Sequence, residues 1–140
     1  MTETATRSYN LQNFGAWADM GQHKHGSIPG KAFVQSALGT TSCEISLNRA
    51  PAGAGMPFLH AHRQNEEVYI VVSGNGIFHL DGEEIAIQEG SVIRVAPSVA
   101  RGYVAGSEDL CFICVQAREG SLTDGTTKDG FRLEAKASWM

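Results

Sequence analysis

The chain has 140 residues, of which 42% are hydrophobic and 16 are glycine, and it carries a formal net charge of −4 at pH 7. This length is typical of one domain that buries roughly two-thirds or more of its unfolded surface. Acidic residues outnumber basic ones, so the sequence provides no basic patch that could bind nucleic acid. No apolar run reaches the length of a membrane span. We therefore expect no nucleic-acid or membrane partner. The N-terminus has no cationic-then-apolar signal sequence, so we expect a cytoplasmic protein.

The first part of the chain predicts an irregular arm. Residues 1–30 are polar and interrupted by glycines, and Pro29-Gly30 predicts a turn that leads into regular structure. His23 and His25 have H-x-H spacing, but no carboxylate follows at a useful distance. We interpret both as solvated loop histidines.

Two strands are expected next, over residues 31–38 and 41–48, because both stretches alternate. The second stretch alternates more clearly. Its apolar residues occupy one face and its polar residues, Glu44, Ser46 and Asn48, occupy the other.

Three side chains farther along can share one divalent metal ion: His60, His62 and Glu67. Successive side chains of a strand point to opposite faces, so two histidines that are two residues apart project the same way. Four residues separate His62 from Glu67, enough for a turn into a second strand over 67–72 that returns the carboxylate to the imidazoles. Residues 74–76, Gly-Asn-Gly, then predict a tight hairpin.

This pattern of H-x-H, four residues, Glu, six residues and Gly resembles the first conserved motif of the cupin superfamily. Its positions are filled by His60, His62, Glu67 and Gly74. Glu66 is also a carboxylate, but it lies out of frame with the glycine, so Glu67 is the expected ligand. The resemblance covers about residues 40–117 and implies an all-β double-stranded β-helix, or jelly-roll barrel, with these residues lining an interior pocket.

We divide the chain into an N-terminal arm (1–30), the cupin barrel (31–117) and a C-terminal tail (118–140) that packs on the barrel. Within the barrel, Asp-Gly at 81–82 predicts a hairpin between alternating segments. Further strands are expected over 90–96, 101–105 and 110–116.

Two features of these strands have consequences of their own. Val68, Ile70 and Val72 form an outer apolar face that must be covered by the N-terminal arm, another sheet or a partner chain, and a homodimer is one expected cover. Such dimers are common among the proteins that this chain resembles. Cys111 and Cys114 have C-x-x-C spacing but face opposite sides of a strand, and we interpret all three cysteines of the chain as small buried side chains.

The second cupin motif departs from the family pattern. Gly90 and Pro97 match it, but Arg101 stands where a histidine completes the metal shell, and a guanidinium offers no lone pair. In one interpretation His60, His62 and Glu67 still bind a metal, and Arg101 orients an anionic ligand beside it. In the other, the guanidinium occupies the place of the metal and pairs bidentately with Glu67, which leaves a metal-free pocket.

We favour the metal site, with Fe, Zn, Ni or Mn as the ion. The resemblance then implies a metal-dependent enzyme, an oxygenase or an isomerase or lyase, acting on a small anionic metabolite. Arg101 would fix a carboxylate of that metabolite, and Tyr103, two residues on, would donate its hydroxyl. The alternative is a non-catalytic binding module for a sugar or organic acid, with or without metal. A storage or scaffold role, with a His-Glu-Arg network that only holds the barrel together, also remains open.

Overall fold

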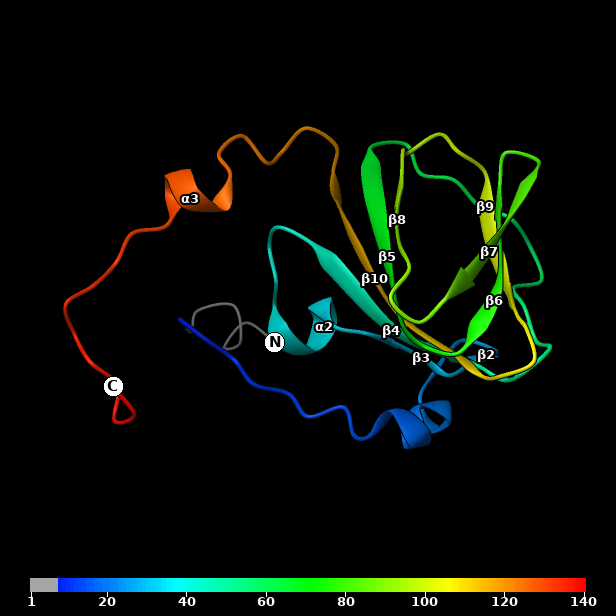
Figure 1. The fold of residues 1–140 in the computed structure, drawn as a ribbon, viewed down its shortest axis with the longest axis horizontal. Coiled ribbons are helices and arrows are strands. Elements are labelled where there is room, and N and C mark those ends of the chain that lie inside the picture. The colour runs from blue at the N-terminus through cyan, green and yellow to red at the C-terminus, as the bar shows by residue number, and fades with distance from the viewer. Residues whose placement is uncertain (1–7) are drawn as a thin grey trace.

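Two antiparallel sheets that face each other form the barrel in this computed structural model, which describes residues 8–140 (Figure 1). The larger sheet contains, in spatial order, Lys31–Phe33 (β3), Glu44–Ala50 (β4), Leu110–Arg118 (β10), Asn65–Ser73 (β5) and Val92–Val95 (β8). The smaller sheet contains Glu83–Gln88 (β7), Asn75–Leu80 (β6) and Arg101–Ala105 (β9). The all-β architecture predicted from the sequence is confirmed.

Five short elements lie outside these sheets. They are the 3-10 helix Trp17–Gln22 (η1), the paired strands Lys24–His25 (β1) and Ile28–Pro29 (β2), and the helices Gln35–Leu38 (α2) and Thr126–Asp129 (α3). Of the arm expected over 1–30, residues 1–7 lie outside the described residues. The rest of that arm contacts the barrel: Met20 is buried, and the Arg49 guanidinium donates to the Trp17 carbonyl at 2.8 Å. None of the described helices has the length and apolar character needed to cross a membrane.

The core lies between the two sheets, and β5 contributes to it by simple alternation. Glu67, Tyr69 and Val71 point inward and are almost fully buried, as the alternation predicts. The Tyr69 ring meets Phe78 of the other sheet edge-on at 4.6 Å between centroids. This aromatic contact packs the two sheets together beside the Glu67 carboxylate and stabilises the part of β5 that carries it.

The hairpin predicted at residues 74–76 is wrong. β5 pairs with β10 and β8, whereas β6 pairs with β7 and β9, so this segment carries the chain from one sheet to the other. Gly74 has φ +88°, and a Cβ there would overlap the Asp109 carbonyl oxygen. Glycine is needed at this crossing both for its left-handed backbone and for the close approach of the chain before β10.

The hairpin predicted at residues 81–82 is confirmed, since β6 and β7 pair directly across it. Asp81 and Gly82 both have positive φ, as a two-residue turn of this kind requires. The strand expected over 31–38 is only half correct, because it ends at Phe33 and α2 follows. Gly39, in a left-handed conformation, ends that helical turn and donates to the Gln35 carbonyl at 2.7 Å.

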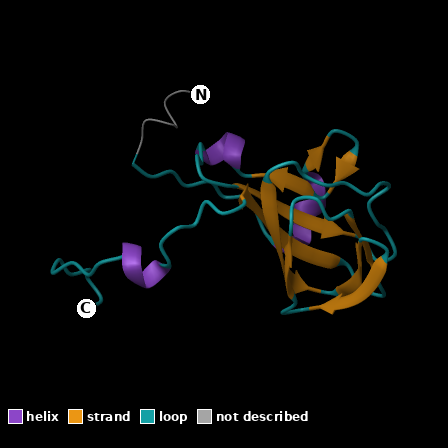
Figure 2. Cartoon of the chain, turned by 90° about the horizontal axis from the view of Figure 1, so that it is seen from above, coloured by secondary structure: helices purple, strands orange, loops and turns teal. Residues whose placement is uncertain are grey.

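From the sequence we expect the segment 118–140 to pack on the barrel. Only its start does so, since Arg118 ends β10 and the Glu119 N–H donates to the Gln64 carbonyl at 3.0 Å. The rest of the tail runs away from the barrel (Figures 1 and 2). Its large apolar side chains are exposed: Leu122, Phe131, Leu133, Trp139 and Met140. Within the single chain these side chains therefore contribute little to the core.

Substituting Gly74 tests the crossing between the sheets. We expect Gly74→Ala to lower the free energy of unfolding by about 2 kcal/mol more than Gly82→Ala, measured by urea denaturation. Both glycines have positive φ, but a Cβ at Gly82 would enter open space. The control therefore carries the backbone strain without the overlap. Equal losses in the two variants would contradict the crowding at Gly74.

Candidate metal centre

His60 and His62 lie on an extended segment between β4 and β5 that is not a regular strand, so the strand predicted there is wrong. Pro57 cannot donate to a ladder, and the segment pairs with β9 through isolated bridges. His60 and Arg101 exchange backbone N–H···O bonds of 3.0 Å in both directions. The His62 N–H donates to the Pro97 carbonyl at 2.8 Å. The histidines are thus positioned by β9 and the loop before it.

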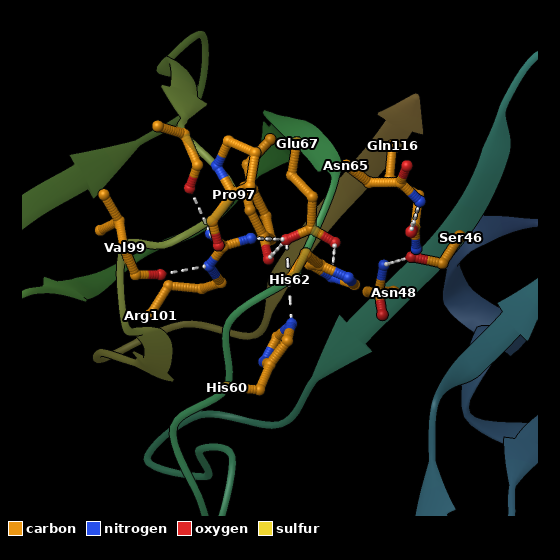
Figure 3. A network of polar contacts seen from close by, with 12 residues as sticks. Ser46, Asn48, His60, His62, Asn65, Glu67, Pro97, Val99, Arg101 and Gln116 are labelled. Carbon is orange, nitrogen blue, oxygen red and sulfur yellow. Dashed lines mark hydrogen bonds and ion pairs between the residues drawn. The ribbon is translucent and has the colours of Figure 1, made fainter. Parts of the chain in front are cut away.

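The structure brings the three predicted ligands together (Figure 3). His60 and His62 project to the same side, with ring centroids 5.2 Å apart. Nε2 of His62 lies 3.1 Å from Oε2 of Glu67, and Nε2 of His60 lies 3.8 Å from Oε1. One ligand atom from each residue lies within 4.8 Å of the others. Two imidazoles and one carboxylate in this arrangement form a donor set that suits Fe(II), Zn, Ni or Mn.

Glu67 is held as a carboxylate although only 3% of its surface is exposed. The Tyr69 hydroxyl donates to its Oε1 at 2.6 Å, and Nη1 of Arg101 donates to the same oxygen at 2.7 Å. Burial by itself would raise the pKa of Glu67, but these hydrogen bonds and the nearby positive charge lower it below its ordinary value. The second oxygen, Oε2, is hydrogen-bonded to Nε2 of His62 at 3.1 Å, and an ion would bind between these two atoms in place of the proton that they share.

His60 is predisposed to be neutral, which a metal ligand must be. Burial lowers its pKa, and the charges of Arg101 and Lys31 add to this effect, against an opposing contribution from Glu67. A neutral imidazole beside an ionised carboxylate is the protonation state that a divalent ion needs. The chemistry of the three residues therefore fits a metal ion.

Arg101 is wholly buried and lies beside Glu67, on the side away from Asn48 and Ser46 (Figure 3). Its Nε donates to the Val99 carbonyl at 2.9 Å, and Nη2 donates to the carbonyls of Ala96 at 2.6 Å and Pro97 at 3.0 Å. Only Nη1 contacts Glu67, so the bidentate pair considered from the sequence is not formed. All but one of its N–H donors are used, and Arg101 is not among the residues that line the cavity.

A cavity of about 300 Å³ opens beside the three ligands. Tyr103 lines it, packed edge-on against Phe112 with centroids 4.8 Å apart. Burial raises the pKa of Tyr103 to about 12, so its hydroxyl stays protonated at neutral pH. Across residues 8–140 this hydroxyl has no hydrogen-bond partner. It can therefore donate to a ligand, as the sequence-based role for Tyr103 requires.

Several residues of this cavity were missed by sequence reasoning. They are His25, Lys31, Phe33, Ser46, Cys114 and Gln116. The signal that could have found some of them is the polar face of β4, because Ser46 and Asn48 point inward and are almost fully buried. His25 is exposed, but its ring packs edge-on against Phe33 at 4.8 Å and lines the cavity.

Comparisons with known proteins agree with this geometry. A family model described as "Cupin domain" matches residues 47–116. A cupin protein from Bacteroides fragilis is 35% identical, with a TM-score of 0.78 over 91% of this chain and 99% of that one. A comparison with curated protein sequences gave no match.

Two further solved structures support the fold alone, because their identity is below 25%. A Klebsiella pneumoniae protein with a double-stranded β-helix domain is 18% identical, with a TM-score of 0.63 over 79% of this chain and 94% of that one. A Thermotoga maritima protein described as a predicted oxalate decarboxylase is 24% identical, with a TM-score of 0.56 over 63% of this chain and 78% of that one.

Removing Arg101 tests whether the buried charges depend on each other. We expect Arg101→Met to lower the free energy of unfolding by about 3–5 kcal/mol, because it leaves the Glu67 carboxylate buried without its counter-charge. Arg94→Met is the control, since Arg94 pairs with Glu66 at the surface, and it should cost less than about 1 kcal/mol. Chemical denaturation of both variants measures the difference. A small loss for Arg101→Met would show that the pair does not hold the site.

Proposed function

This chain belongs to the cupin family, and we propose that it holds a divalent metal ion at His60, His62 and Glu67 and acts as a small metal-dependent enzyme. The observation that carries the proposal is the convergence of three suitable ligand atoms within 4.8 Å at the wall of a cavity. An oxygenase or an isomerase or lyase acting on a small anionic metabolite fits a site with three protein ligands, because it leaves coordination positions for the substrate.

The residues around the ion would have distinct tasks. When bound, the ion supplies a Lewis acid that polarises an oxygen atom of the substrate. Arg101 and Tyr69 hold Glu67 in its ionised form through Oε1. Tyr103 is placed to donate its hydroxyl to a ligand in the cavity.

A second candidate is a non-catalytic binding module for a sugar or organic acid, with or without metal. The observation that favours it is the apolar lining around the ligands, which includes Met56, Phe58 and Phe112. A ligand held by shape and by a few polar contacts needs no reacting group. The two candidates differ in whether the bound molecule is converted, whereas both place it in the same cavity.

Metal content tests the first candidate. We expect protein purified without a histidine tag to carry close to one equivalent of metal by elemental analysis, and a His60→Ala, His62→Ala double variant to lose it. A His23→Ala, His79→Ala double variant is the matched control, because it removes two histidines that do not line the cavity. Wild-type protein that contains no metal and cannot be reconstituted with Fe, Zn, Ni or Mn would rule out the metal-dependent enzyme.

We also propose a homodimer formed through the outer face of the larger sheet. Val68, Ile70 and Val72 are only half-buried there, and Ile70 is paired across the strands with Val92, which is 64% exposed. This apolar face continues to the edge strand β8, where a second copy of the chain can cover it. The exposed apolar side chains of 118–140 offer further contact surface to that copy.

Val92→Asp tests this dimer. Light scattering after size exclusion should give twice the 15.0 kDa chain mass for the wild type and a lower mass for the variant. A desolvated charge at the centre of an apolar interface is unfavourable. Ile85→Asp, at an exposed position of the other sheet, should leave the mass unchanged. A wild-type monomer, or an unchanged mass for Val92→Asp, would exclude this interface.

A further inference from the structure

The cavity has an uncompensated positive charge. Lys31 and Glu67 are the lysine and the carboxylate among the residues that line it. Glu67 is already neutralised by its 2.7 Å contact with Arg101. Lys31 makes no ion pair with any residue in the described part of the chain. Lys31 therefore brings to the cavity wall a positive charge without an anionic partner.

Lys31 is held in place by a short chain of polar groups. It lies opposite Asn48 in the pairing of β3 with β4, and its Nζ donates to Oδ1 of Asn48 at 2.7 Å. Asn48 in turn donates through Nδ2 to Oγ of Ser46 at 2.9 Å, and both residues are at least 96% buried. Figure 3 shows this Asn48–Ser46 contact on β4 beside the triad. The buried amide is oriented so that its oxygen accepts from the ammonium.

This arrangement leaves the ammonium partly unsatisfied. One N–H of Lys31 is used by Asn48, and the other two remain for a ligand. The Phe33 ring lies 5.3 Å from Nζ and shields one side of the charge from water. Burial lowers the pKa of Lys31, and the opposing contributions of Cys114 and Glu67 do not cancel this effect. An incoming anion would stabilise the charged form.

Lys31 and the metal centre share one cavity. Lys31, His60 and Glu67 all line it. One small molecule that fits the cavity can therefore meet the ammonium and the His-His-Glu site at the same time.

We propose that Lys31, positioned by Asn48 and Ser46, is the subsite that binds the anionic group of the ligand. This inference rests on the proposed function, in which the other end of the same molecule binds at the metal. The ligand is then a small molecule with oxygen donors for the ion at one end and a carboxylate or phosphate at the other. Lys31 thus takes over the anion-binding role that the sequence suggested for Arg101.

Matched ligand pairs test this subsite by calorimetry on zinc-loaded protein. Succinate and succinamate share one carboxylate and differ in the second charge, and phosphoglycolate and glycolate differ in the phosphate. We expect wild-type protein to prefer the doubly charged member of at least one pair by about tenfold or more, because a charge-assisted hydrogen bond is lost in the other member. The pair that shows the preference identifies carboxylate or phosphate as the anionic group.

Three variants assign the preference to Lys31. Lys31→Met should abolish the preference, Lys31→Arg should retain most of it, and Lys24→Met, at an exposed position, should leave it unchanged. Zinc stoichiometry is measured for each protein, because loss of zinc reports on the metal site and not on Lys31. If wild-type protein does not retain zinc, the proposed function fails and the same preference is measured without metal. Three results would each overturn the subsite. They are equal binding of the two members within both pairs, no binding of any of the four ligands, and a preference that survives in Lys31→Met.

Discussion

The buried ion pair between Arg101 and Glu67 is the interaction on which the site depends. Moving two charges out of water costs several kcal/mol per ion, and this cost is offset only where the remaining donors and acceptors are satisfied. Here the guanidinium donates hydrogen bonds to three backbone carbonyls, those of Ala96, Pro97 and Val99. These bonds fix the loop between β8 and β9. That loop and β9 hold the irregular histidine segment through its backbone. One arginine therefore positions both imidazoles and the carboxylate without contacting the ligand cavity.

This anchoring role has a consequence for the charge of the metal centre. Arg101 cancels the charge of Glu67 and occupies its Oε1, so the carboxylate presents only Oε2 to an ion. In our proposal, a divalent ion bound by two imidazoles and by a carboxylate whose charge is already paired would keep most of its positive charge. It would attract anionic oxygen donors, and Lys31 would act in the same direction from another wall of the cavity. These charges would favour an anionic small molecule over a neutral one.

The sequence was sufficient for the fold and for the convergence of His60, His62 and Glu67, but not for the rest of the cavity. Alternation in β5 placed Glu67 on the inner face correctly, because the period of a strand is independent of its partners. The crossing at Gly74 and the irregular path through His60 depend on pairing between distant segments, which a local pattern does not encode. Ser46 and Asn48 were recognised as one polar face of a strand. The polar face of a strand is ordinarily exposed to solvent. Only the packing of the second sheet shows that the polar face of β4 points inward.

Arg101 and Lys31 are the two cations near the cavity, and they differ in how many of their N–H donors are already hydrogen-bonded. This difference indicates their roles better than their distance from the sequence motif does. Arg101 stands at a motif position, yet its N–H groups are almost all bonded within the protein, and breaking those bonds to bind a ligand would cost more than a new contact returns. Lys31 lies outside any motif, and among the described residues only Asn48 accepts a hydrogen bond from its ammonium. A cation that the fold has saturated stabilises structure, whereas a cation that the fold positions and leaves unsatisfied is suited to binding. By this criterion Arg101 belongs to the scaffold, and in our proposal recognition of the anion falls to Lys31 on β3.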